Sequence, residues 1–335
     1  MQAKAINDRG DVVGFADTDN GNGPIHAILW KGGKAEGAVD LGVLPGYVSS
    51  EAYGINDRRV VFGVLYDRQD RTFPFRLENG RMTLLKDPGG RVRPADIAQR
   101  NTINARGEIA TTLLVGSKRQ AVRWTPAGKA TYLPSLPGHA WTNVFGINDD
   151  GIVSGWSRKL PNDDGAENPV VWTKAGKVIA LKTVAGQADG IAEATNRAGL
   201  IVGYLGNQSE TVPEMDQFAV WSRHTAEPKL FGAKRNWLIG EFVDLNDRGQ
   251  AIGMTGSLNP QNGFKHAKPV IWRSGWSDVR PLAVPKVGKG SVTVVELNDL
   301  NDRGAIVGNV YGLAAKDYGA LRSITPVLWS CAFGG

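Results

Sequence analysis

Cysteine and histidine are scarce in this sequence, and it has no long apolar run. Cys331 is the only cysteine and the four histidines are scattered, so an internal disulfide is excluded, and we expect neither a structural zinc site nor redox chemistry. No stretch approaches the ~18 consecutive apolar residues of a membrane-spanning helix, and the first residues lack the apolar core of a signal peptide. We therefore expect a chain without a membrane span.

Runs of like charge and the common catalytic motifs are missing as well. The 39 basic and 33 acidic residues give a net charge of +6, but the basic residues are dispersed, so we expect no nucleic-acid partner. The motifs of serine hydrolases, zinc proteases and phosphate-binding loops do not occur. Two aspartate-rich segments, 17–21 and 162–165, lack the final glutamate of a complete calcium loop. They predict at most weak calcium binding, and no other cofactor is expected.

What the sequence does contain is glycine and a repeat. Its 43 glycines exceed average usage, which indicates many tight turns. A segment like that at residues 5–14 occurs seven times in the chain, with an average spacing of 49 residues. Its asparagines are Asn7, Asn56, Asn104, Asn148, Asn196, Asn246 and Asn301. A short apolar segment follows each asparagine, and in six repeats it ends in a tryptophan: Trp30, Trp124, Trp172, Trp221, Trp272 and Trp329.

Each repeat has the pattern of four short antiparallel strands. The first strand ends at the asparagine, a tight turn leads into a β-branched second strand, the tryptophan segment forms the third, and a further turn precedes the fourth. Four-stranded units of this length are typical of β-propeller blades, whereas a solenoid repeats at a shorter interval and a sandwich does not repeat so regularly. The sequence therefore predicts an all-β, seven-bladed β-propeller that occupies residues 1–335 as a single domain.

Closure of the ring is the open point of this architecture. After Trp329 the seventh repeat has no convincing fourth strand. We therefore expect the last blade to have three strands, or to receive a contribution from the N-terminal residues.

The repeats resemble the HAF repeat, a bacterial and predominantly extracellular repeat named for a His-Ala-Phe triplet before the tryptophan. The matching segments are His26–Trp30 and Leu41–Gly46, and Leu133–Gly138 is a near copy of the second. The resemblance covers the whole chain, but only the first repeat retains His-Ala, and Thr111 replaces the final glycine of the third hairpin. It implies a propeller-like protein located outside the cell or in the periplasm, and it implies no particular activity.

Features present in all repeats are interpreted as parts of the fold. We expect the asparagines to form turns and the tryptophans to pack between blades, because a residue that recurs in every blade usually serves the fold. Function is expected where the repeat is broken, on the face that carries the loops between blades. We call this the loop face, and the opposite face, which carries the asparagine turns, the turn face.

One register near the loop face carries mostly polar residues. Five positions before the repeat asparagines stand Gln2, Glu51, Gln99, Asn143, Ile191, Glu241 and Glu296. They begin the innermost strands, so their side chains would ring the mouth of the central channel, and Glu193 or Asp189 could substitute for Ile191. Two interpretations are open: a solvated channel lining, or an acid-lined pocket for a cation or polyol. Carboxylates forced together there would raise at least one pKa and could supply a general acid.

The loops between blades supply a second set of candidates. Tyr47, Arg93, Trp141, Arg235 and Trp237 combine aromatic rings with cationic groups, which suits stacking on sugars and binding of anions. The alternative interpretation is a solvated rim. Together with Asn143 and Glu193, these residues form the predicted ligand-binding set.

These features lead to two functional hypotheses. The first is an exported, non-enzymatic propeller that binds a carbohydrate, an anionic small molecule or a protein partner through the loop face and the channel mouth. The second is a lyase or hydrolase at the channel mouth, with His139 as general base and Glu51, Glu241 or Glu296 as its carboxylate. Contact between His139 and a carboxylate would favour catalysis, and an open ring of solvated carboxylates would favour binding.

Overall fold

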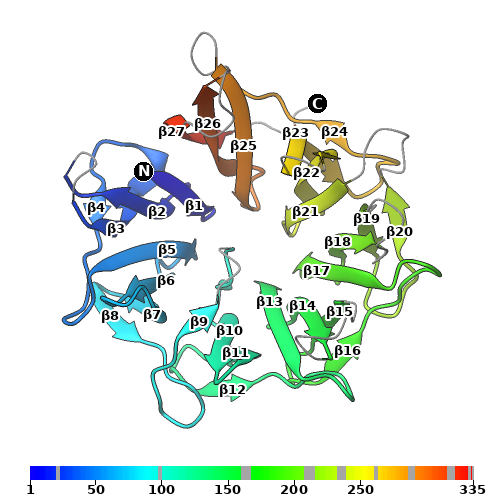
Figure 1. Cartoon of the computed structure of the whole chain (residues 1–335), viewed down its shortest axis with the longest axis horizontal. Helices are drawn as coiled ribbons and strands as arrows, with labels where there is room; N and C mark the ends of the chain where they lie inside the picture. Colours follow the sequence, from blue (N-terminus) through cyan, green and yellow to red (C-terminus); the bar gives the residue numbers. More distant parts are fainter. Residues whose placement is uncertain are drawn as a thin grey trace.

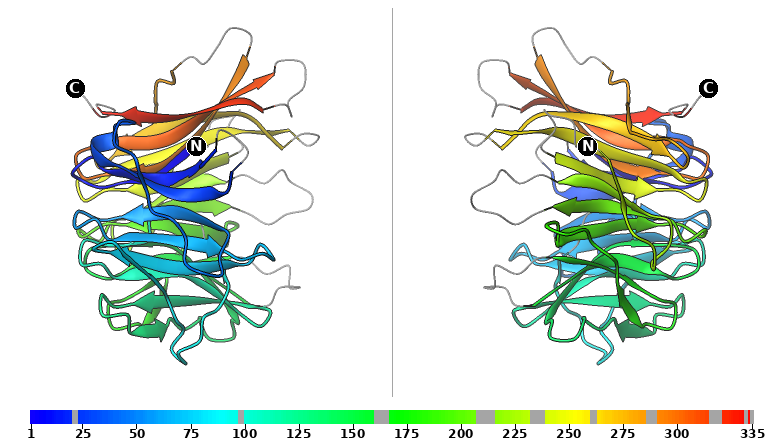
Figure 2. Two further views of the ribbon diagram at one scale, coloured as in Figure 1. Left: turned by 90° about the vertical axis from the view of Figure 1, so that its left-hand side faces the viewer. Right: turned by 90° about the vertical axis from the view of Figure 1, so that its right-hand side faces the viewer.

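The computed structural model describes residues 1–19, 23–96, 100–159, 167–206, 216–231, 239–259, 263–285, 291–314, 321–330 and 333. These residues form seven antiparallel β-sheets around a central channel, so the predicted seven-bladed β-propeller is confirmed (Figure 1). Views along the edge of the ring show the strands running from one face to the other (Figure 2). No helix within the described ranges is long and apolar enough to cross a membrane.

The blades follow one another along the chain, and strand order runs from the channel to the rim. Blades 1 to 3 contain β1–β12: Gln2–Ile6, Val12–Asp17, Ile25–Trp30, Val39–Asp40; Ser49–Ile55, Val61–Tyr66, Thr72–Glu78, Arg81–Leu84; Ala95–Asp96, Ile109–Val115, Lys118–Trp124, Ala130–Tyr132. Blades 4 to 6 contain β13–β24: Trp141–Ile147, Val153–Arg158, Asn168–Trp172, Val178–Ala180; Asp189–Thr195, Ile201–Gly206, Gln217–Trp221, Lys229–Phe231; Ile239–Leu245, Gln250–Asn259, Gly263–Arg273, Arg280–Pro281. Blade 7 has three strands, β25–β27: Ser291–Leu300, Ile306–Ala314 and Leu321–Trp329. A 3₁₀ turn, η1 (Lys31–Gly33), follows β3.

The turn between the first and second strands explains the repeated asparagines. In blade 1, Asn7 Oδ1 accepts hydrogen bonds from the backbone N–H groups of Arg9 (3.0 Å) and Asp11 (2.9 Å), so the side chain caps its own turn. Gly10 adopts the left-handed conformation that this turn needs, with φ of 78°, and Arg59 adopts it in blade 2 with φ of 58°. The prediction that these asparagines form turns is confirmed.

The repeated tryptophans fill the seams between neighbouring blades. Trp124, Trp172 and Trp221 are fully buried. Each of these indoles donates its N–H to a backbone carbonyl of the preceding blade, in the order Lys86, Pro134 and Lys182. The large ring is therefore buried while its one polar atom keeps a partner, as expected for a tryptophan that packs between blades.

The innermost strand has one register in six blades. The residue five positions before the asparagine pairs with the residue eight positions after it, as Glu51 pairs with Val64. A β-bulge then falls at the third position before the asparagine, which is Glu193 in blade 5. The bulge recurs in blades 1, 2, 4, 5, 6 and 7, so it is a regular part of this fold.

Blade 3 departs from this register, and one prediction is wrong there. Thr112 stands eight positions after Asn104, but it pairs with Asp96 in β9 and not with Gln99. The residue that pairs with this position therefore stands eight positions before the asparagine, three more than in the other blades, and Gln99 itself lies outside the described residues. Counting back from the asparagine failed because it assumes an uninterrupted strand.

Candidate functional site

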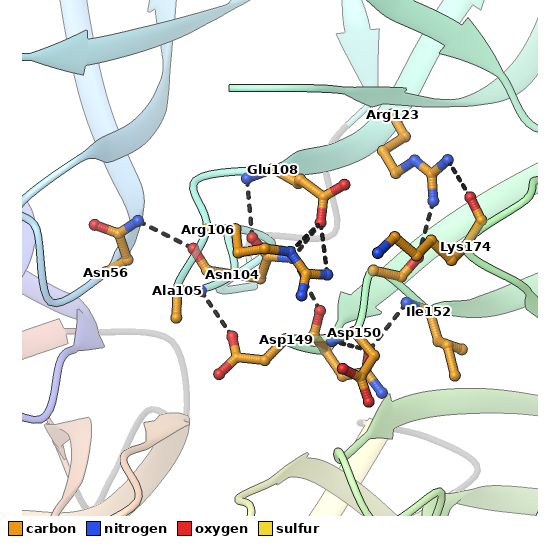
Figure 3. Close-up of polar contacts among 12 residues, drawn as sticks. Asn56, Asn104, Ala105, Arg106, Glu108, Arg123, Asp149, Asp150, Ile152 and Lys174 are labelled. Carbon is orange, nitrogen blue, oxygen red and sulfur yellow. Dashed lines mark hydrogen bonds and ion pairs between the residues drawn. The ribbon is translucent and has the colours of Figure 1, made fainter. Parts of the chain in front are cut away.

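A closed ring of hydrogen bonds joins the seven asparagine turns. The Nδ2 of each repeat asparagine donates to the backbone carbonyl of the repeat asparagine in the next blade, at 2.9–3.1 Å. Asn301 donates back to Asn7 and completes the ring. Figure 3 shows the step from Asn56 to Asn104. Each asparagine thus holds its own turn with its oxygen and the next blade with its nitrogen.

The residue after the asparagine builds a second ring around the same opening. Where it is an aspartate, its carboxylate accepts the backbone N–H from the matching position of the preceding blade. The Ala105 N–H, for example, donates to Asp149 Oδ1 at 2.7 Å (Figure 3). The aspartates that accept in this way are Asp8, Asp57, Asp149, Asp247 and Asp302. Their carboxylates are therefore fixed around the channel mouth on the turn face.

These aspartates surround a cavity of about 170 Å³. Asp244 and Asp299 also contribute to its lining, which raises the number of lining aspartates to seven. None of the described residues that line it is a lysine or an arginine. We call this cavity the acidic pocket; it opens on the turn face, whereas the sequence pointed to the loop face.

Burial and mutual repulsion act on the carboxyl groups of the acidic pocket. Burial raises the pKa of Asp302 to about 6, and the carboxylates of Asp247 and Asp8 add to the shift. Burial and the carboxylate of Asp57 also raise the pKa of Asp8. Arg197 offsets part of the charge from outside the lining through an ion pair with Asp247 at 2.7 Å. An excess of negative charge remains in the pocket.

A buried carboxyl pair forms the inner part of the lining. Asp244 and Asp299 hydrogen-bond to each other, which requires a proton on one of the two groups. Asp299 is 3% exposed, and burial together with Asp244 raises its pKa well above the ordinary value. Its Oδ2 accepts hydrogen bonds from the backbone N–H of Ile6 (2.7 Å) and from Nδ2 of Asn101 (3.1 Å). The pair is thus held by blade 1 and by the segment that enters the channel from blade 3.

That segment also brings a cation, Arg100, into the channel. Residues 100–104 lie in the central opening of the ring (Figure 1), where the guanidinium of Arg100 is 3.6 Å from Glu193 and 3.3 Å from Glu241. Glu193 is 1% exposed, and neither of its oxygens receives a hydrogen bond from a donor among the described residues. Burial raises its pKa well above the ordinary value and Glu241 adds to the shift, while Arg100 opposes it.

The predicted channel glutamates do not form one site. Glu51 accepts a hydrogen bond from the Tyr66 hydroxyl at 2.9 Å. Glu296 pairs with the buried ammonium group of Lys4 at 2.8 Å, and although burial acts to raise its pKa, this pairing lowers it. Glu241 is the one that shares a partner with Glu193, through Arg100. The ring predicted from the sequence is therefore divided into separate, internally paired groups.

His139 forms no hydrogen bond or ion pair with a carboxylate in the described part of the chain. Its Nδ1 lies 3.1 Å from Ser157 Oγ. Asn143 accepts a hydrogen bond from the hydroxyl of Thr112. The contact that would favour catalysis at the channel mouth is thus not formed among these residues.

The aromatic candidates of the loop face are engaged in packing. Tyr47 lies edge-on to Phe73, with 5.6 Å between ring centroids. The guanidinium of Arg119 lies 5.8 Å from the centroid of the Trp141 ring. Both aromatic side chains are half-buried, so neither offers a fully open ring to a ligand.

Among the cationic candidates, the one that the structure describes is also engaged with a neighbouring side chain. Arg93 forms an ion pair with the buried carboxylate of Asp87. Arg235 and Trp237 lie outside the described residues, as does the aspartate-rich segment 162–165. The lining of the acidic pocket includes none of Tyr47, Arg93 and Trp141.

Comparisons with known proteins support the fold. No family model and no curated protein matches the chain. The β-propeller domain of the Trilobed protease from Pyrococcus furiosus, which has an open velcro topology, matches with a TM-score of 0.58 and 10% identity over 98% of this chain and 96% of that chain. The acylaminoacyl peptidase of Pyrococcus horikoshii matches with a TM-score of 0.54 and 10% identity over 95% of this chain and 53% of that chain. A puromycin-hydrolyzing peptidase of Mycobacterium tuberculosis matches with a TM-score of 0.54 and 13% identity over 97% and 53%. This chain spans about half the length of the two peptidases, and at these identities the likeness shows the fold alone.

Sequence reasoning missed the residues that define the acidic pocket and the channel. The repeat pattern assigns the aspartates after the asparagines to the turns, and it gives no sign of the roles of Arg100, Asp244 and Asp299. One signal was available: Thr111 replaces the hairpin glycine in the repeat whose innermost strand is interrupted.

Proposed function

We propose that this chain is a binding propeller whose acidic pocket holds the amine or guanidinium group of an organic cation. The observation that carries the proposal is the lining of the 170 Å³ cavity, with seven aspartates and no basic side chain among its described residues. Carboxylates held close together repel one another, so a positive charge that enters the pocket lowers the free energy of the whole group. Burial is the main reason why the pKa of Asp302 is raised to about 6, and repulsion from the carboxylates of Asp247 and Asp8 adds to this shift.

The geometry favours an organic cation over a metal ion. In the described ranges no three His, Cys, Asp or Glu side chains converge closely enough to hold a metal. Carboxylates spread around a rim suit a ligand that presents several N–H donors, since a metal ion needs oxygen atoms within about 2.6 Å of one point. An anionic ligand would meet repulsion at every side of this pocket.

The loop-face hypotheses remain predictions. A carbohydrate, an anionic molecule or a protein partner would have to displace the contacts that already engage Tyr47, Arg93 and Trp141. Catalysis at the channel mouth would have to recruit His139 from its contact with Ser157. Export rests on the resemblance to HAF repeats alone.

Titration calorimetry with spermidine at low ionic strength and pH 7.5 tests the proposal. Asp57→Asn keeps an oxygen for the Asp8 N–H but removes one charge from the pocket, so we expect affinity to fall about fivefold. Asp70→Asn is the matched control, because it makes the same charge change at an exposed turn of blade 2 outside the pocket. Its affinity should equal that of the parent protein.

The pH dependence supplies a second readout. Lowering the pH from 7.5 to 5 protonates Asp302, whose pKa is about 6, and should weaken spermidine binding. Absence of binding at pH 7.5, or equal affinities of Asp57→Asn and Asp70→Asn, would overturn the proposal.

A further inference from the structure

In the part of the chain that the structure describes, the outer edge of blade 7 is not paired with a further strand. Blades 1 to 6 each place a fourth strand along the third, whereas β27 (Leu321–Trp329) is the outermost strand of blade 7 among the described residues (Figure 1). The contacts that the fourth strand makes in the other blades therefore indicate which contacts are open at the edge of β27 among the described residues.

In five blades the fourth strand leads to a leucine with a fixed backbone partner. The leucine N–H donates, at 2.9 Å in every case, to the carbonyl three positions before the repeat tryptophan, or before Leu77 in blade 2. The donor and acceptor pairs are Leu41 and Ala27, Leu85 and Pro74, Leu133 and Ala121, Leu181 and Pro169, and Leu282 and Pro269. The register of the missing strand is therefore defined to the residue.

The leucine side chain and the carbonyl that follows it fill the seam to the next blade. Leu133 packs against Val144 and Val153, which stand four positions before and five positions after Asn148 in blade 4. Trp172 of blade 4 donates its indole N–H to Pro134 O at 2.7 Å. The same two positions of the next blade lie in one apolar cluster with Leu181, as Ala192 and Ile201, and with Leu282, as Leu297 and Ile306.

The equivalent position exists between blades 7 and 1; we call this position, formed by Ala3, Val12, Trp30 and residues 326–328, the seat. Its apolar part is a cavity of about 190 Å³ lined by Ala3 and Val12, which stand four positions before and five positions after Asn7. Val327 and Leu328 of β27 line the opposite side, and Leu328 is 43% exposed. None of the described residues occupies the position that the leucine after the fourth strand has in the other blades.

The polar part of the seat is also without its partners. Pro326 stands three positions before Trp329, like Pro169 before Trp172, and no backbone or side-chain donor among the described residues reaches its carbonyl. Trp30 lines the cavity, and within the described residues its indole N–H forms no hydrogen bond. The seat thus offers one acceptor, one donor and one apolar cavity in the arrangement that the leucine segment satisfies elsewhere in the ring.

We propose that this seat binds an extended, leucine-bearing peptide strand of a partner protein, which adds to β27 as the fourth strand of blade 7. The leucine N–H of the peptide donates to the Pro326 carbonyl, its side chain enters the 190 Å³ cavity, and the next carbonyl accepts the Trp30 indole N–H. In strand addition of this kind, main-chain hydrogen bonds give affinity and the side-chain pocket gives specificity. The proposal is independent of the acidic pocket.

The probe is a labelled peptide with the sequence of residues 176–183, GKVIALKT, which forms the fourth strand and leucine of blade 4. Fluorescence anisotropy should show saturable binding to the parent protein. A second peptide that carries Asp in place of its leucine should bind at least about tenfold more weakly, because the carboxylate would enter an apolar cavity.

Two variants of the protein locate the binding. Ala35→Arg puts a long side chain at the exposed edge of the cavity, and Trp30→Phe removes the indole donor but keeps an aromatic ring. Each should weaken peptide binding at least about tenfold, whereas Ala127→Arg, a similar change at an exposed turn of blade 3, should leave it unchanged. Thermal melting checks that the variants fold, and Ala35→Arg decides the question if Trp30→Phe does not fold.

Three results would overturn the proposal. The first is absence of peptide binding, and the second is equal binding of the leucine and aspartate peptides or of the parent protein and Ala35→Arg. The third is a dimer in sedimentation velocity that Ala35→Arg abolishes and excess peptide does not displace, which would assign the seat to a second copy of this chain.

Discussion

Asn301 donates a side-chain N–H to the backbone carbonyl of Asn7 at 2.9 Å and so connects the last repeat to the first across 294 residues. Among the described residues, blades 1 and 7 share no strand, since the strands of blade 1 come from one end of the chain and those of blade 7 from the other. Side chains therefore join them: Asn309 Oδ1 accepts the backbone N–H of Ala3 at 3.0 Å, and Lys4 pairs with Glu296. Polar contacts replace the shared strand that closes many propellers.

Because the seven asparagines form a closed ring of hydrogen bonds, we expect that replacing any one of them lowers the free energy of unfolding strongly. Asn148 accepts the N–H groups of Asp150 and Ile152 and donates to the carbonyl of Asn196, all while 5% exposed. Asn148→Ala leaves these groups without partners, and we expect the free energy of unfolding to fall by about 3 kcal/mol. Asp150→Ala, in the same turn but exposed, should cost less than about 0.5 kcal/mol. Urea denaturation of both variants measures this, and equal costs would show that the ring does not stabilise the fold.

Asp302 predicts that stability falls as the pH rises. Its pKa is raised in the folded protein to about 6 from 3.8, chiefly by burial, so between these values the folded state binds more protons than the unfolded state. The free energy of unfolding should therefore decrease from pH 4 to pH 6 because of this group, and remain lower above it. Asp302→Asn keeps an oxygen for the Asp247 N–H and should stabilise the protein at pH 7.5 by about 1 kcal/mol, after allowance for solvent screening of a half-buried group. No gain at pH 7.5, or an equal gain at pH 4, in chemical denaturation would contradict this reasoning.

Loss of the Arg100 guanidinium should lower the stability by an amount that depends on pH. Arg100→Met leaves the carboxyl groups of Glu193 and Glu241 in the channel without their cation, which should cost about 3 kcal/mol at pH 8. The loss should shrink at pH 5, because burial and the loss of the guanidinium favour the protonated form of Glu193. Arg119→Met is the control, since it removes a cation from an exposed ion pair with Asp96 and should cost less than about 1 kcal/mol at either pH. A loss independent of pH would mean that Arg100 acts through packing alone.

The sequence was sufficient for the architecture because each repeat carries its own turn and packing residues. Asn7 and its six equivalents fix the turn locally, and the tryptophans mark the third strand, so periodicity alone predicted seven blades. It left two possibilities for the last blade, three strands or a contribution from the N-terminal residues, and among the described residues this blade has three strands. The register predicted for blade 3 was wrong because the regular spacing of the asparagines hides the interruption. Thr111 at the position of the hairpin glycine was its one local sign, and the pairing of Asp96 with Thr112 shows where the register changes.

The site was harder to predict because it depends on contacts between distant repeats. Arg93 and Trp141 look available in the sequence, and their partners Asp87 and Arg119 are found only in the folded ring. The aspartates of the acidic pocket belong to the turn motif, so a rule that assigns repeated residues to the fold also hid their combined charge at the channel mouth.

The hairpin glycine and its exception in blade 3 give a matched pair of variants. In blade 4, a Cβ on Gly155 would overlap the backbone carbonyl oxygen of Asn143, because the bulged innermost strand lies directly against it. In blade 3 the same position holds Thr111, which is 2% exposed, and there the innermost strand leaves this register after Asp96. Both Gly155→Ala and Thr111→Ala place alanine at one structural position.

We expect Gly155→Ala to lower the free energy of unfolding by at least about 3 kcal/mol, because the backbone must move. Thr111→Ala should lower it by about 1 kcal/mol, because only a hydroxyl group and its packing are lost. Urea denaturation followed by near-ultraviolet circular dichroism measures both, and a cost for Gly155→Ala no greater than that for Thr111→Ala would show that the interrupted strand is not what admits a side chain in blade 3.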